Sequence, residues 1–139
     1  MATHDYELAN PPTDKRELEL WLQHAAGKIV FEDARQYAIN KIDSKISSKS
    51  RDAAIKAIDD AIYGMMMIFD GVAGCLENTK HSVRLETLVT LSKKNESGDT
   101  VQIEGVRLSE GDEMCMGYHG WVKNDYGKRA LVTAFNEST

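Results

Sequence analysis

The stretch from residue 50 to residue 71 limits most strongly what this chain can fold into. Its apolar residues recur at alternating steps of three and four, which places them on one face of an α-helix. They are Ile55, Ile58, Ile62, Met65 and Phe69. Ser50 can cap the first turn, and Gly71 can take the left-handed conformation that ends a helix. We therefore expect a central helix whose methionine-rich end is buried on most sides.

Two shorter helices are expected before it. Residues 13–26 place Leu18, Trp21 and Leu22 on one face, and Gly27 is expected to end that helix. Residues 30–47 have apolar residues at helical spacing, with acids in the first turn and a lysine in the last, as the helix dipole favours. The N-terminal half is thus predicted to contain three helices.

The pattern changes after Gly71. Residues 72–81 are expected to form a loop or a short irregular helix, whereas residues 83–91 alternate between apolar and polar, which is typical of a half-buried strand. A turn over residues 94–99 leads to a second strand over residues 101–108, with a bulge near Gly105. A helix over residues 111–126 and a short strand over residues 129–135 are expected to follow.

These elements predict an α+β fold. Three N-terminal helices would pack on a small antiparallel sheet, made of a β-hairpin and a short third strand, with one further helix toward the C-terminus. Residues 1–12 are expected to form a flexible arm, residues 13–135 a single domain, and residues 136–139 a polar tail. A chain of 139 residues is long enough for one such domain.

Composition narrows the classes of function. The net charge of −5 argues against nucleic acid or anionic lipid as the main partner, and no apolar run approaches the length of a bilayer span. The N-terminus lacks the pattern of a secretory signal, so a cytoplasmic location is expected. Cys75 and Cys115 do not form a CxxC pair and are expected to be reduced, with a long-range bridge as the open alternative.

One cluster could carry chemistry. Asp112, Cys115 and His119 follow one another at steps of three and four, so a helix would place them on one side as a thiol nucleophile or a partial metal site. The competing interpretation is a cysteine packed as a small apolar residue, which is the commoner case. Zinc requires three or four ligands, so we expect no metal and no cofactor. The methionines are interpreted as core filler rather than as a ligand cavity.

A second candidate site is acidic. Residues 96–113 contain six acids and a single cation, Arg107. Tyr118 and Trp121, in the densest aromatic patch of the chain, could anchor a protein interface, with core packing as the favoured competing interpretation. The predicted binding residues are Glu104, Glu110, Asp112, Glu113, Tyr118 and Trp121.

Together these features predict a non-enzymatic protein-binding module. Its most concrete form is an immunity or inhibitor protein that neutralises a basic bacterial toxin or nuclease through an acidic face. The alternative is a small-molecule-binding domain or a thiol-dependent enzyme that uses Cys115 and His119. A homodimer formed through the methionine-rich end of the central helix is a third interpretation.

Overall fold

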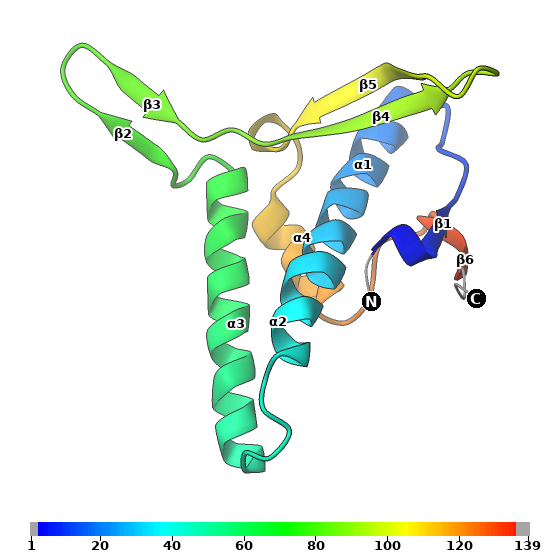
Figure 1. Cartoon of the computed structure of the whole chain (residues 1–139). Helices are drawn as coiled ribbons and strands as arrows, with labels where there is room; N and C mark the ends of the chain where they lie inside the picture. Colours follow the sequence, from blue (N-terminus) through cyan, green and yellow to red (C-terminus); the bar gives the residue numbers. More distant parts are fainter. Residues whose placement is uncertain (1–2, 136–139) are drawn as a thin grey trace.

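The computed structural model describes residues 3–135. In this range the chain forms three helices and six short strands (Figure 1). The first helix runs without a break from residue 15 to residue 40. The long N-terminal helix and α3 lie side by side, and the short α4 contacts both. The N-terminal helix consists of α1, a π-helical turn η2 and α2. The helical bounds are α1 Lys15–Val30, η2 Phe31–Arg35, α2 Gln36–Asn40, α3 Ser48–Phe69 and α4 Met114–Trp121.

The strands form three separate antiparallel pairs, β1–β6, β2–β3 and β4–β5. Figure 1 shows β4–β5 crossing one end of α1, whereas β2–β3 projects away from the helices beyond the end of α3. The strand bounds are β1 Tyr6–Leu8, β2 Cys75–Glu77, β3 Ser82–Arg84, β4 Leu88–Lys94, β5 Thr100–Arg107 and β6 Val132–Phe135. Two short 3-10 turns, η1 Thr3–Asp5 and η3 Leu108–Glu110, complete the chain.

The predicted arrangement of three N-terminal helices on one small sheet, followed by a further helix, is therefore wrong. The main error lies at Gly27, which was expected to end a helix and instead lies inside α1. A Cβ at this position would lie 2.5 Å from Cδ2 of Trp121. The glycine is thus explained by the close approach of an indole ring from α4 and not by a helix end.

The second predicted helix is also too long. The N-terminal helix ends at Asn40, and residues 41–47 connect it to α3. The helix predicted from residue 50 is confirmed as α3, but it begins at Ser48, because Ser47 accepts a 3.1 Å hydrogen bond from the backbone N–H of Ser50. Its methionine-rich end is only partly covered, since Met66 is fully buried and Met65 is 37% exposed.

The structure has three separate pairs of strands where a single sheet was predicted. The strand at the C-terminal end, β6, pairs with β1 in the segment expected to be a flexible arm, and the Ala9 N–H donates to the Leu131 carbonyl at 2.8 Å. Residues 75–77, expected to be loop or helix, form β2 and pair with β3. Both missed strands are three residues long, too short for alternation to mark them. The predicted polar tail, residues 136–139, lies outside the described residues.

The last predicted helix is shorter than residues 111–126. It forms only α4, and Asn124 then adopts a positive φ of 62°, a conformation that ends helices. Two groups of buried residues make the core, one between α1, α3 and α4 and one between α1 and β4–β5, and Val89 and Tyr126 pack against both. The predicted bulge near Gly105 is present in the β4–β5 hairpin. It lies two residues away, where Ile103 is the extra residue between Gln102 and Glu104.

Candidate functional site

Cys115 and His119 lie one turn apart on α4 and face the end of α3. The Asp70 carboxylate accepts hydrogen bonds from the backbone N–H groups of Met114 at 2.5 Å and Cys115 at 2.9 Å, so it caps the start of α4. The Tyr63 hydroxyl lies beside the Cys115 thiol, and the centroids of the Tyr63 and His119 rings are 6.1 Å apart. The structure therefore brings the thiol and the imidazole to the same part of the surface.

The environment of this thiol opposes a nucleophilic role. Burial raises the pKa of Cys115, and the neighbouring Asp70 carboxylate raises it further. A reactive cysteine needs the opposite shift, because the thiolate is the nucleophile. The arrangement is better explained as a helix cap with a protonated thiol beside it.

Asp112, the predicted third member of this cluster, lies elsewhere. It precedes α4 and forms an ion pair with Arg16 of α1, in which both carboxylate oxygens lie 2.8 Å from the guanidinium Nη2. The Asp112 backbone is fixed as well, since its N–H donates to Oε1 of the buried Gln23 at 2.8 Å and its carbonyl accepts from Nε2 of the same side chain. Asp112 thus connects α4 to α1 and is engaged away from Cys115.

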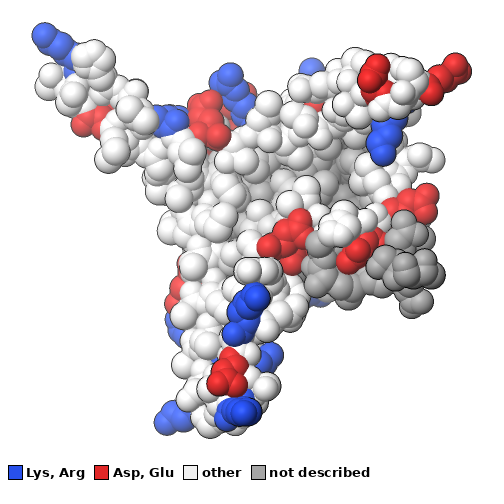
Figure 2. All heavy atoms as spheres, in the orientation of Figure 1, with Lys and Arg blue, Asp and Glu red and all other residues white. Residues whose placement is uncertain are grey.

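The acidic stretch of residues 96–113 does not form one compact patch. Glu96 and Asp99 lie in the β4–β5 turn, whereas Glu110 lies beyond the other end of β5, an eight-residue strand about 25 Å long. Residues 88–107 carry three acids and three cations, and Arg107 lies 4.0 Å from Glu110. Figure 2 shows the acids in separate groups over the visible face, with cations gathered at the end formed by α2 and the start of α3.

The two aromatic candidates are largely internal. Trp121 is 3% exposed and belongs to the core, where its indole stacks on the Tyr126 ring. Tyr118 is partly buried, with its ring 5.6 Å from that of Phe31 and 5.1 Å from that of Tyr63. Neither residue offers a large apolar surface to a partner.

The β2–β3 hairpin offers such a surface. All six strand residues are exposed, and Leu76 is paired directly with Val83. Leu85 follows Val83 by two residues, so the three side chains lie on one face of the hairpin. Their exposed fractions are 77%, 69% and 60% respectively. The three side chains therefore form a contiguous apolar strip on an exposed hairpin.

Comparisons with protein-family models, with curated proteins and with solved structures find no match. Within residues 3–135, no group of three or more His, Cys, Asp and Glu side chains is placed to hold a metal ion. None of the helices in the same range combines the length and apolarity that crossing a bilayer requires. The site must therefore be assessed from its own geometry.

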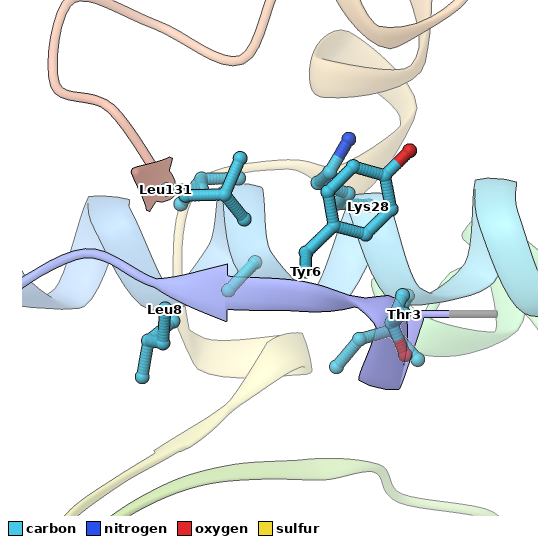
Figure 3. Close-up of a pocket in the computed structure, with 8 residues that line it drawn as sticks. Thr3, Tyr6, Leu8, Lys28 and Leu131 are labelled. Atoms are coloured by element: carbon cyan, nitrogen blue, oxygen red, sulfur yellow. The ribbon is translucent and has the colours of Figure 1, made fainter. Parts of the chain in front are cut away.

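One apolar cavity, of about 160 Å³, lies between β1, β6 and α1 (Figure 3). Its polar side chains are already engaged. The Thr3 hydroxyl donates to Asp33 at 2.6 Å, and the Lys28 ammonium lies 3.5 Å from Glu32 and over the rings of Tyr6 and Tyr126. We interpret this cavity as a gap in the packing of the two chain ends.

Two features were missed by the sequence reasoning. The first is the β2–β3 hairpin. Its apolar residues Leu76, Val83 and Leu85 are separated by the turn at Asn78, so neither three-residue strand has an alternation long enough to predict it. The second is His24, which has no matching partner motif in the sequence. It is paired through space, since the Trp121 indole N–H donates to its Nδ1 at 2.9 Å.

Proposed function

We propose that this protein is a non-enzymatic binding protein that recognises another protein through the β2–β3 hairpin. The apolar strip of Leu76, Val83 and Leu85 is the observation that carries this proposal. A lone two-stranded hairpin is marginally stable in water at best, and one with exposed apolar residues gains most from being covered by a partner. Hairpins also accept extended segments along their free edges.

We also propose that the partner is basic, as for an immunity or inhibitor protein that neutralises a basic toxin or nuclease. The net charge of −5 supports this, because a negative protein attracts a positive one over long range and speeds their encounter. In this proposal the charge acts through the field of the whole molecule. The acids of residues 96–113 contribute to that field rather than forming the contact surface.

The test is a binding measurement with the basic proteins encoded by neighbouring genes. The wild-type chain should bind one of them with an association rate that falls as ionic strength rises. The double variant L76S/V83S should weaken binding at least about tenfold through a faster dissociation rate, since apolar contacts near the centre of an interface carry most of its affinity.

Val101→Ser is the matched control, because Val101 is also an exposed valine and lies on the other hairpin, β4–β5. It should bind as the wild type does. Unchanged dissociation of L76S/V83S would refute the hairpin as the contact surface. An association rate indifferent to salt would refute the basic partner.

A further inference from the structure

The hydrogen bonds of β2–β3 determine which backbone groups of the hairpin are free. The Leu85 N–H donates to the Gly74 carbonyl at 2.9 Å, so these two residues form a hydrogen-bonded pair at the base of the hairpin. Hydrogen-bonded and non-hydrogen-bonded pairs alternate along an antiparallel ladder. The next pair, Cys75 with Arg84, is therefore non-hydrogen-bonded, and its N–H and C=O groups point to the two outer edges.

Each outer edge presents the backbone of alternate residues. Cys75 and Glu77 lie on the edge of β2, and Arg84 and Ser82, their partners in the register, lie on the edge of β3. Within residues 3–135, no other element forms a hydrogen bond with the backbone of these four residues, and all four are exposed. Both edges can therefore accept an extended segment, which pairs with a strand through such groups.

Among the described strands, only β2 and β3 pair in an uninterrupted register. The register of β1–β6 shifts between Glu7 and Leu8, and that of β4–β5 shifts between Leu91 and Ser92. Such irregularities hinder the addition of a further strand, as do lysine and proline on an edge. The β2–β3 register has no shift, and β2 contains neither lysine nor proline. The edge of β2 therefore lacks the features by which proteins usually block strand addition.

Charge distinguishes the two edges. The edge of β2 carries Glu77, which is exposed and has no ion-pair partner among residues 3–135. β3 carries Arg84, and the turn before it carries Lys80. Opposite charges on neighbouring strands stabilise their pairing and like charges oppose it, so a basic segment is favoured beside β2 and disfavoured beside β3. The opposite face of β2 offers Leu76, which is 77% exposed.

We propose that the basic partner supplies an extended segment that pairs with the edge of β2, with a cationic side chain opposite Glu77 and an apolar one opposite Leu76. This mode of binding rests on the proposed protein-binding function of the hairpin and specifies the chemistry of the partner. The backbone of Cys75 and Glu77 forms the hydrogen bonds. Because side chains alternate between the faces of a strand, the segment alternates basic and apolar residues, and its apolar residues extend the strip across a third strand.

The test uses a short synthetic peptide of alternating lysine and valine as the probe. Its Kd for the wild-type chain should be about 1 mM or lower. Two N-methylated forms keep the same side chains and charge. Methylation of the lysine nitrogens removes the N–H groups that donate to Cys75 and Glu77, so binding should weaken at least about tenfold. Methylation of the valine nitrogens removes only N–H groups that face away from β2, so the affinity should be unchanged.

Cys75→Pro and Ser82→Pro are the matched variants of the protein. Each removes one outward N–H, on opposite edges of the hairpin, and neither changes the charge. Cys75→Pro should weaken the unmodified peptide about fivefold or more, whereas Ser82→Pro should bind it as the wild type does. Nuclear Overhauser contacts between the two strands verify that each variant keeps the hairpin.

Three results would overturn pairing with the edge of β2. They are equal affinities of the two methylated peptides, equal effects of the two proline variants, and no binding of the unmodified peptide at about ten times the expected Kd. If L76S/V83S still weakens binding of the partner protein in that event, the protein-binding function stands and only the mode of contact is wrong.

Discussion

The indole Nε1 of Trp121 donates a 2.9 Å hydrogen bond to Nδ1 of His24, which joins α4 to α1. The same indole lies against Gly27 of α1 and Gly117 of its own helix, where a Cβ would collide with the ring. Trp121 is therefore positioned by one hydrogen bond and by two glycines that leave room for its ring. The packing of α4 against α1 depends on all three.

This hydrogen bond predicts a dependence of stability on pH. Burial lowers the pKa of His24, and Asp125 and Asp112 oppose that shift only in part. A protonated His24 cannot accept from Trp121, so the unfolded chain binds the proton more readily. The stabilising contribution should be complete above about pH 6.5, the ordinary pKa of histidine, and should be lost as the pH falls through the lower folded value.

Urea unfolding between about pH 7.5 and pH 5 measures this effect, since ordinary carboxylates titrate mostly below that range. The wild type should lose stability across the range. His24→Gln, which does not titrate, should lose less. Equal losses in the two proteins would contradict the role of His24.

Two glycines in helices should respond to alanine in opposite ways. Gly27→Ala should destabilise the protein by about 1–3 kcal/mol, because the new Cβ overpacks against Trp121 and outweighs the gain in helix propensity. Gly64→Ala in α3 meets nothing within 4 Å and should stabilise by up to about 1 kcal/mol. Urea unfolding of both variants measures the two changes in unfolding free energy. A Gly27→Ala protein as stable as the wild type would contradict the packing of Trp121 against Gly27.

Asp70 should control the reactivity of Cys115. Asp70→Asn removes a negative charge that raises the pKa of Cys115, so the thiol should react faster with a disulfide reagent near pH 8. The weakened cap should also cost about 1 kcal/mol of stability. The measurement uses a Cys75→Ser background, because Cys75 is exposed and would react as well.

Asp60→Asn is the control for this experiment, since Asp60 pairs with Lys56 on the exposed side of α3. It should leave the reaction rate of Cys115 unchanged. A rate in Asp70→Asn that equals the wild-type rate would show that the carboxylate does not influence the thiol.

The hairpin residues should matter little for folding. L76S/V83S should change the free energy of unfolding by less than about 0.5 kcal/mol, because both side chains are already exposed. Urea unfolding measures this directly. A loss of several kcal/mol would show that the apolar strip stabilises the chain itself and is not a free surface.

The sequence predicted the elements whose periodicity extends over many residues and failed where the structure depends on distant contacts. Helix α3 and the β4–β5 hairpin were found because their patterns are long. The helix end predicted at Gly27 was wrong, because a glycine that ends a helix and a glycine that leaves room for an indole ring look the same in the sequence. Strand β1 was missed because its partner lies more than a hundred residues away.

The candidate site shows the same limit. Helical spacing correctly placed Cys115 and His119 on one helix, but it could not show that Asp70 would cap that helix and raise the pKa of the thiol. Asp112 was grouped with them by spacing alone, and its ion pair with Arg16 depends on how α1 packs near α4. Charge counted along the chain likewise did not predict how the acids are spread in space.

Amide hydrogen exchange of the β2–β3 hairpin, with and without the basic partner, tests the central claim most directly. In the free protein, the amides of residues 75–77 and 82–84 should exchange rapidly, because this hairpin projects away from the helices, its strand residues are all exposed, and such a hairpin is marginally stable alone. Saturation with the partner should slow their exchange more than that of any other exposed segment. Protection confined to other surfaces, with the hairpin amides unchanged, would contradict the account.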